Sequence, residues 1–446
     1  MTASPPTTTD DGTETPPWRV EVVADSDSRW KWGATVAARL VADRPAQLHA
    51  TLLLGRSVPN DQQLADIGIT PASLRRASIA ETVARLADSD AEVVVLACIG
   101  GCVQSLLHAL GRAWRDRPTR PVVVTGYVGL VYEKIIDGLV NRAGADLVLA
   151  NCDADAARFA DVFADLGADP KSVVATALPF LGGAPYDAAQ ARQRHPFTLT
   201  FVTQPGVPQQ EAERRHVLEQ AAAYGRRHPD HAVVVKLRAR VGDRTTHVEP
   251  FHFEALLPPE ELPPNLTFAY GAMDAVLDRT DLCVTVSSTA AIEAMHRGIP
   301  TALLTDYGIR ESLGNQLFVG SGAMTSWPSL LRGELPVTRP EWAAAHGVVV
   351  GPDSYTAAAD RLGELVAKRA ELPPLRPWLD EERAGAYLPG LLARYGIDRT
   401  GAVLAPSDAI GTRPSFARRA ARVAARRAYR YGVRVVEPRV KRIAQL

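Results

Sequence analysis

A hydroxyl-rich turn separates an apolar run from a short helical pattern in "VTVSSTAAIEAMHRGIP", residues 284–300. Ser287, Ser288 and Thr289 occupy this turn, although one such side chain is enough to cap a helix. The further hydroxyls and the free amides at the positive end of the helix dipole favour an anion such as a phosphate. Glu293 lies one turn further on the same helical face, where its carboxylate can accept hydrogen bonds from ribose hydroxyls. The pattern indicates a nucleotide site, and the alternative is a capped helix with a solvated Glu.

Two other apolar runs in this half of the chain also end in polar side chains. In "VVVKLRAR", Lys236, Arg238 and Arg240 alternate, so an extended chain presents them on one side, where they could neutralise a departing phosphate. In "TLTFVTQPGVP", Thr203 and Gln204 close the run. We predict that Thr203, Gln204, Lys236 and Arg238 line the same nucleotide site. A solvated basic edge and a simple Pro-Gly turn are the alternatives.

The first half of the chain places carboxylates beside aromatic rings. The segment "VVADSDSRWKWG" ends an apolar run with Asp25 and Asp27, and Trp30 follows them. A carboxylate can act as general base toward a hydroxyl, and a ring face can stack on a sugar. We predict a binding loop in which Asp25 or Asp27 is the catalytic base and Trp30 contacts the acceptor, the molecule that carries this hydroxyl. Because Asp is also an ordinary turn and N-cap residue, a purely structural role is the alternative.

A second segment of the first half, "TGYVGLVYEK", combines glycines with groups that can form hydrogen bonds. Gly126 permits a close backbone approach, and Tyr127 and Glu133 are predicted to contact the acceptor. A tight turn explains the same glycine equally well.

Metal and cofactor motifs are weak or missing in the sequence. The pattern D-x-D occurs at 25–27, 88–90 and 153–155, and three copies of so short a motif in an Asp-rich chain indicate chance. No phosphate-binding P-loop or dinucleotide fingerprint is found, so we predict neither a metal nor a cofactor. The four cysteines lie in or beside apolar runs without paired zinc spacing, which indicates buried thiols in a reducing compartment. They are Cys98, Cys102, Cys152 and Cys283.

Positioning these residues requires two α/β domains. The 446 residues exceed the ~250–300 at which one core stops growing. From Trp18, short apolar runs alternate with helical patterns, which indicates a parallel sheet covered on both faces. After a Gly- and Pro-rich stretch at about 180–197 the alternation starts again, and it includes a short helix over 290–297. Open parallel sheets bind ligands at the carboxyl ends of their strands, so we predict two Rossmann-like, doubly wound domains that face a cleft.

The predicted domain boundaries follow from these changes in pattern. They are a disordered tail at 1–17, a first domain at 18–183, a second domain at 184–372, and a Pro-rich linker with a basic helical tail at 373–446.

Composition excludes several classes of protein. Fifty acidic side chains balance fifty basic ones, which gives no electrostatic reason to expect a nucleic-acid partner. The N-terminus lacks the pattern of a signal peptide, and no run approaches the ~20 apolar residues that span a bilayer. We therefore expect a cytoplasmic protein that can be peripheral on the inner face of the membrane.

The end of the chain is strongly basic. Residues 413–442 contain eleven basic side chains and one acid, Glu437. If 415–431 is helical, arginines gather on one face and alanines on the other. Such a helix would bind an anionic membrane surface, at ~1 kcal/mol per basic residue, or would pack through its Ala face on the first domain.

A resemblance supports the nucleotide interpretation. The block "NLTFAYGAMDAVLDRTDLCVTVSSTAAIEAMHRGIPTALL" resembles the donor-binding half of GT-B glycosyltransferases, in which strand, helix, strand, S-S/T turn, Glu-containing helix and G-x-P follow in this order. The S-S-T turn is similar to that of bacterial capsule-type enzymes, including polysialyltransferases and CDP-glycerol polymerases, and the layout resembles actinobacterial glycosyltransferases. Polysialyltransferase-like enzymes carry a His-Pro pair near the point where this chain has Leu237 and Arg238, which leaves the nucleobase of the donor open.

The resemblance implies a GT-B enzyme that needs no metal. It would move a sugar from a nucleotide-sugar donor, held by the second domain, to a cell-surface glycan or glycolipid precursor. A nucleotide-sugar 2-epimerase, a CDP-alcohol phosphotransferase and a non-catalytic, membrane-associated nucleotide-binding protein are the alternatives.

Overall fold

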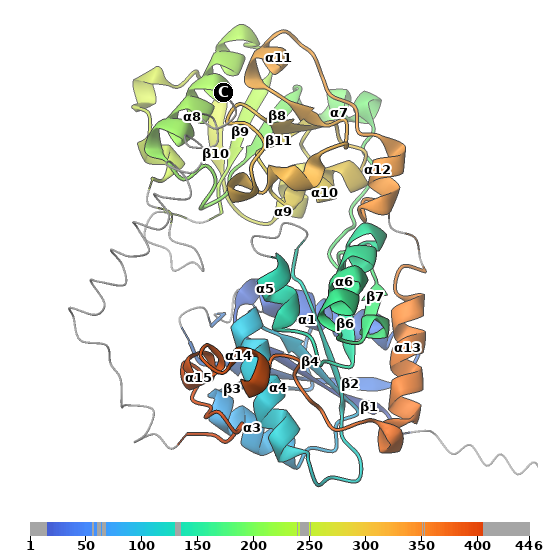
Figure 1. Cartoon of the computed structure of the whole chain (residues 1–446). Helices are drawn as coiled ribbons and strands as arrows, with labels where there is room; N and C mark the ends of the chain where they lie inside the picture. Colours follow the sequence, from blue (N-terminus) through green and yellow to red (C-terminus); the bar gives the residue numbers. More distant parts are fainter. Residues whose placement is uncertain are drawn as a thin grey trace, which may run out of the picture.

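Two parallel sheets form separate domains in the computed structural model (Figure 1). The structure describes residues 16–55, 58–59, 64, 68–129, 135–238, 240, 249, 251–349, 351 and 353–404. The predicted fold class, two doubly wound α/β domains, is confirmed. The predicted tail at 1–17 is described only at its last two residues, and the basic stretch at 413–442 lies outside the described residues.

The first domain contains a seven-stranded sheet in the order β3-β2-β1-β4-β5-β6-β7. Its strands are β1 (Trp18–Ala24), β2 (Ala46–Leu53), β3 (Ser73–Ala77), β4 (Val93–Ala97), β5 (Val122–Gly126), β6 (Leu147–Ala150) and β7 (Val173–Ala175). Five of them, β1, β2, β4, β5 and β6, are apolar over most of their length. Together with the shorter β7, they account for the apolar runs that alternate with helical patterns from Trp18. The edge strand β3, "SLRRA", was missed because its exposed face is basic.

Helices cover both faces of this sheet. They are α1 (Asp27–Leu40), α3 (Ile79–Ala87), α4 (Gly100–Ala113), α5 (Ile135–Val140) and α6 (Asp153–Leu166). Side chains of α3, α4 and α6 share one core with Val23 and Val94, whereas α1 packs on the opposite face with Val22 and Val95. In α1, a Cβ on Gly33 would lie 2.6 Å from that of Ala97, so glycine lets the helix approach β4 closely.

The second domain contains a six-stranded sheet in the order β10-β9-β8-β11-β12-β13. Its strands are β8 (Thr198–Val202), β9 (Ala232–Lys236), β10 (Leu266–Ala269), β11 (Leu282–Thr285), β12 (Thr301–Leu304) and β13 (Met324–Thr325). Its helices are α7 (Ala188–Arg194), α8 (Glu211–Arg227), α9 (Met273–Leu277), α10 (Ala290–His296), α11 (Trp327–Leu331) and α12 (Pro340–Ala345). The helix predicted at 290–297 is confirmed to within one residue.

The chain returns to the first domain after α12, where Figure 1 shows α13 (Thr356–Ala367) lying along the lower sheet. Ala358, Leu362 and Val366 of α13 are buried in the same core as α1. Beyond it, α14 (Glu381–Ala384) and α15 (Leu388–Ala393) lie against α4, with Leu388 and Leu392 in the other core. This finding corrects the predicted end of the second domain at 372 and the linker from 373. The apolar spacing of α13 predicts a helix but does not say which sheet the helix covers.

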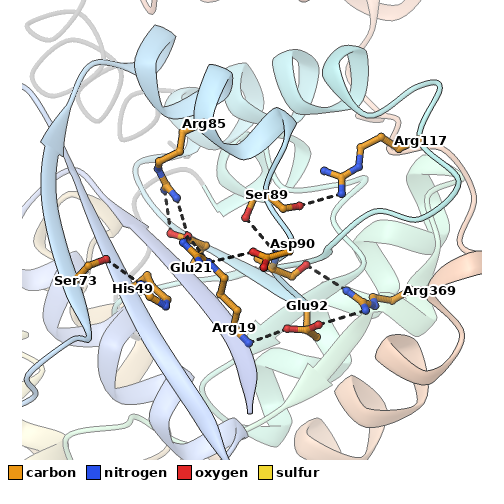
Figure 2. A network of polar contacts seen from close by, with 11 residues as sticks. Arg19, Glu21, His49, Ser73, Arg85, Ser89, Asp90, Glu92, Arg117 and Arg369 are labelled. Carbon is orange, nitrogen blue, oxygen red and sulfur yellow. Dashed lines mark hydrogen bonds and ion pairs between the residues drawn. The ribbon is translucent and has the colours of Figure 1, made fainter. Parts of the chain in front are cut away.

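Buried charges reinforce the first domain (Figure 2). Glu21 of β1 is 0% exposed, and Arg85 of α3 donates to its two carboxylate oxygens at 2.6 and 2.9 Å. At the edge of the same network, Arg369 lies 3.3 Å from Glu92. The network therefore joins β1 to α3 and to the chain that returns behind α13.

Candidate functional site

The order of the second sheet reverses between β8 and β11, which is where open α/β sheets bind ligands. Gln204 follows β8 and Ser287 follows β11, and the two residues join the strand ends. The Ser287 amide donates to Gln204 Oε1 at 3.0 Å, and Gln204 Nε2 donates to the Ser287 hydroxyl at 3.2 Å. The structure thus brings two predicted site residues, 83 positions apart, into direct contact at the expected edge.

The three hydroxyls of the turn have different environments. Ser287 is buried, and its hydroxyl donates to the Leu313 carbonyl, so it serves the fold. Ser288 is partly exposed and its hydroxyl accepts from the Ala290 amide at 3.2 Å. Thr289 is partly exposed and makes no capping hydrogen bond with its side chain. Of the three predicted phosphate ligands, Ser288 and Thr289 are therefore available to a ligand, and Ser287 shapes the turn.

Glu293 lies one turn further along α10 in a half-buried position. Burial raises the pKa of its carboxyl to about 7, partly offset by the positive charge of Lys31. Lys31 belongs to α1 of the first domain, and its Nζ lies 5.3 Å from the centre of the Phe180 ring. A carboxyl of the second domain is therefore influenced by a cation of the first.

The cations predicted at the end of β9 are not equivalent. Lys236 is 5% exposed and donates to the Leu237 carbonyl at 2.6 Å, and burial lowers its pKa. Thr203 is also buried, and its hydroxyl and amide both donate to the Lys236 carbonyl, at 2.9 and 3.1 Å. Arg238, in contrast, is exposed. The structure does not support Thr203 and Lys236 as direct ligands, because their polar atoms are buried and bonded within the strand ends.

Arg214 was missed by the sequence analysis, although it supports the same edge. Its guanidinium is buried beneath the turn after β8 and donates to the carbonyls of Gln204, Pro205 and Pro208 at 3.1–3.3 Å. Glu249 pairs with it. An Arg in an amphipathic helix such as α8 carries no sequence signal for this role.

The first sheet reverses its order between β1 and β4, and Asp25 lies there. Its Oδ1 accepts from Arg29 at 2.7 Å, and its Oδ2 accepts from the Ile99 amide, just beyond β4, at 3.0 Å. Both carboxylate oxygens are thus engaged in holding the strand ends. The predicted binding loop is instead the start of α1, because the Ser26 side chain caps the helix by accepting from the Arg29 amide at 3.4 Å.

Asp27 and Ser28, in the first turn of α1, face the second domain. A guanidinium nitrogen of Arg238 lies 3.2 Å from the Ser28 hydroxyl and 3.9 Å from an Asp27 carboxylate oxygen. The structure therefore brings the predicted base Asp27 next to the predicted phosphate-binding Arg238, from opposite domains.

Two predicted acceptor residues belong to the core. Trp30 is 1% exposed among the aliphatic side chains of α1 and the sheet, so its ring is not offered to a ligand. Gly126 allows the Trp32 ring to pack, since a Cβ there would lie 2.7 Å from that ring. Both predictions are corrected: the helical start of α1 turns Trp30 inward, and the close approach at Gly126 is to Trp32.

Tyr127 is partly buried, and its hydroxyl donates to the Ile135 carbonyl at 3.1 Å. Its ring stacks under Arg142, whose guanidinium carbon is 4.1 Å from the ring centre. Behind it, the Asn151 amide group donates to the carbonyls of Tyr127 and Gly129 at 2.9 and 3.0 Å. Gly129 approaches Thr289, since a Cβ on it would lie 3.3 Å from the Thr289 methyl. The 127–129 loop thus contacts the turn that contains Thr289, whereas Glu133 lies outside the described residues.

The four cysteines are buried free thiols, as predicted. Among the described residues, no helix has both the length and the apolarity that a membrane span requires.

The two doubly wound sheets, each with a switch point in its strand order, define a protein of the GT-B fold class. The chain belongs to the family described as "Putative glycosyltransferase (DUF6716)", whose model matches residues 20–365. No curated protein matches the sequence significantly.

Several solved structures are similar to this chain. The S. aureus MnaA–UDP co-structure matches over 81% of this chain and 99% of its own, with a TM-score of 0.50 and 12% identity. A UDP-GlcNAc 2-epimerase from Neisseria meningitidis, bound to UDP-GlcNAc, matches over 78% and 100%, with a TM-score of 0.47 and 12% identity. A UDP-glucosyltransferase from Polygonum tinctorium matches over 80% and 95%, with a TM-score of 0.46 and 12% identity. At these identities the likeness concerns the fold alone.

Proposed function

We propose that the protein transfers a sugar from a nucleotide-sugar donor to a hydroxyl of a cell-surface glycan or glycolipid precursor. The observation that carries this proposal is the contact of Arg238 with Ser28 and Asp27 across the domain boundary. It sets a cation suited to a leaving phosphate next to a carboxylate suited to deprotonating an acceptor. Membership of a glycosyltransferase family supports the same reaction class.

The donor would bind at the carboxyl edge of the second sheet. Ser288, Thr289 and the amides of their turn would hold the phosphates, and Glu293 would accept hydrogen bonds from the ribose. Lys236 would contribute its charge from a buried position without touching the ligand. The donor half is proposed to work without a metal ion, since Arg238 supplies the positive charge.

Asp27 is the better candidate for the base than Asp25. Both carboxylate oxygens of Asp25 hold Arg29 and the Ile99 amide, whereas Asp27 faces Arg238 and Ser28. A donor phosphate that binds Arg238 would draw the guanidinium from Asp27. The freed carboxylate would take the acceptor proton while the acceptor oxygen bonds to the sugar and the nucleotide leaves with the bonding electrons of the sugar–phosphate bond.

The acceptor class rests on the resemblance of the S-S-T turn to that of capsule-type enzymes. The basic stretch at 413–442, outside the described residues, is proposed to hold the enzyme at the anionic inner face of the membrane.

A nucleotide screen tests the donor site. The melting temperature is measured with UDP, GDP, CDP, CMP and dTDP, each with and without EDTA. One nucleoside diphosphate should raise it by several degrees regardless of EDTA, because a ligand stabilises only the state that it binds. The shift should be lost in Ser288→Ala. Ser326→Ala is the matched control, since Ser326 caps α11 of the same domain, and its shift should persist.

A shift that no nucleotide produces, or that Ser288→Ala retains, would contradict the donor site. With the preferred donor, release of nucleoside diphosphate only when an acceptor is present indicates transfer. Conversion of the sugar without an acceptor would indicate an epimerase instead, and release of CMP would indicate a phosphotransferase.

A further inference from the structure

A group of potential metal ligands lies at the switch point of the first sheet. Asp25, Cys98 and Cys102 each offer one ligand atom, and these three atoms lie within 4.8 Å of one another. No similar group of three His, Cys, Asp or Glu side chains is found elsewhere in the part of the chain that the structure describes. We propose that Asp25, Cys98 and Cys102 form a binding site for a zinc ion.

The ligand types fit zinc. Two sulfurs and one carboxylate oxygen match the donor set that Zn²⁺ accepts, at about 2.3 Å for sulfur and about 2.0–2.2 Å for oxygen. Tetrahedral bonds of that length place the ligand atoms about 3.5–3.8 Å apart, so small side-chain rotations close the observed spacing. Harder ions such as Mg²⁺ and Ca²⁺ prefer oxygen ligands only. A water molecule would complete the tetrahedron.

Local structure holds the three ligands in place. Asp25 follows β1, Cys98 follows β4, and Cys102 lies in the first turn of α4, so the neighbouring strand ends of the switch point converge here. Arg29 donates to Asp25 Oδ1 at 2.7 Å and the Ile99 amide donates to Oδ2 at 3.0 Å. Such outer hydrogen bonds orient a ligating carboxylate.

Charge balance also favours the site. Both thiols are nearly inaccessible to solvent, at 2% and 1% exposure for Cys98 and Cys102. On binding, each thiol loses its proton to solvent, and Cys98 gives up its 3.4 Å hydrogen bond to the Val23 carbonyl. Two thiolates and the Asp25 carboxylate then carry three negative charges, which the ion and the Arg29 guanidinium balance. The positive end of the α4 dipole stabilises the thiolates further.

The paired-cysteine spacing by which zinc sites are recognised in a sequence does not include this arrangement. Cys98 and Cys102 are separated by three residues across a strand-to-helix turn, and their third partner is 73 residues away from Cys98. An ion here would fix the end of β1 to the start of α4, two residues from Asp27. It would also make Asp25 a metal ligand and so leave Asp27 as the base.

The test measures metal directly and needs no substrate. The full chain, freed of any affinity tag, is equilibrated with Zn²⁺ and desalted through a weak chelator, and zinc is then measured by mass spectrometry. We expect about one equivalent in the wild type, and a sulfur-to-metal charge-transfer band when Co²⁺ is used instead. Binding should also release about two protons per ion.

Variants assign the ligands. Cys98→Ser and Cys102→Ser should lose stoichiometric zinc and the Co²⁺ band, and Asp25→Asn, which keeps the shape of the side chain, should bind zinc at least tenfold more weakly. Cys152→Ser is the matched control, because Cys152 is also a buried thiol at a strand-to-helix turn of this domain. A folded wild type without zinc or the Co²⁺ band, or Cys98→Ser and Cys102→Ser variants that retain both, would overturn the proposal. Neither result changes the outcome expected of the nucleotide screen, so the zinc site and the proposed function can be contradicted independently.

Discussion

The guanidinium of Arg238 donates to the hydroxyl of Ser28 at 3.2 Å across the domain boundary. Arg238 follows β9 of the second domain, and Ser28 lies in the first turn of α1. This contact joins the carboxyl edges of two separate sheets, after β9 in the second domain and after β1 in the first. Its role in the proposed reaction and its role in stability can be separated experimentally.

Replacing Arg238 by Gln should affect transfer far more than folding. The pair with Asp27 is partly exposed and 3.9 Å long, so its loss should lower the free energy of unfolding by less than about 1 kcal/mol. Loss of a cation at the leaving phosphate should lower kcat at least tenfold. The measurements are urea denaturation and release of nucleoside diphosphate. Arg332→Gln, which removes an exposed ion pair with Glu334 in the same domain, should leave kcat unchanged. Equal kcat values for the two variants would contradict the role of Arg238.

Asn151 should be a positioning residue for the 127–129 loop. It is 1% exposed and donates to two carbonyls of that loop. Asn151→Asp replaces the donor by acceptors facing those carbonyls, which should cost about 2–3 kcal/mol of unfolding free energy and release the loop from Thr289. Acceptor KM should rise and kcat should fall, with the nucleotide-induced melting shift retained.

Asn265→Asp is the control for this prediction. Asn265 also donates to backbone carbonyls, those of Gly225, His228 and His231, but in the second domain. The Asn265→Asp variant should show a similar decrease in the free energy of unfolding. Its KM for the acceptor, measured well below the melting temperature, should stay the same. If both variants raise acceptor KM alike, Asn151 acts only through general stability.

The buried Glu21 should be the most sensitive member of the network in Figure 2. Glu21→Gln leaves Arg85 without its bidentate partner, and breaking a buried ion pair in this way typically costs about 3–5 kcal/mol. Asp90→Asn is the control, because Asp90 belongs to the same network but its side chain is 84% exposed. Its effect on urea denaturation should stay below about 0.5 kcal/mol. Comparable decreases in the free energy of unfolding of the two variants would show that burial does not determine how much each carboxylate of the network contributes to stability.

The sequence was sufficient to predict most strands, and also the polar residues of the candidate site that follow β8 and β11. Continuous apolar runs in a parallel sheet are buried on both faces, which makes "VVVLA" and "LCVT" easy to recognise. Gln204 and Ser287, the polar residues that follow β8 and β11, then meet because the strand order brings β8 next to β11.

The proposed acceptor side was harder to predict because the start of α1 was missed. Once Ser26 is recognised as the N-cap, Asp27 and Lys31 are four residues apart and share a helical face. That face points to the second domain, and Trp30 turns inward. The return of α13 to the first domain could not be predicted either, since an amphipathic pattern is compatible with either sheet.

Glu293 should make stability and nucleotide binding depend on pH in opposite directions. Burial raises the pKa of its carboxyl from 4.5 to about 7, so the folded state binds more protons than the unfolded state between those values. The free energy of unfolding should therefore fall as the pH rises from about 4.5 to 7, by on the order of 2 kcal/mol. Nucleotide affinity should increase over the upper part of this range, because the ionised carboxylate is the better acceptor for ribose hydroxyls.

Two variants isolate this carboxyl. Glu293→Gln cannot ionise, so it should be more stable than the wild type at pH 8, equal to it near pH 4.5, and nearly constant in nucleotide affinity between them. Lys31→Met removes the charge that lowers the pKa of Glu293, so it should shift the wild-type transition to higher pH. Urea denaturation and nucleotide titration at half-unit pH steps measure both effects. A Glu293→Gln variant that keeps the wild-type pH dependence would assign the titration to another group.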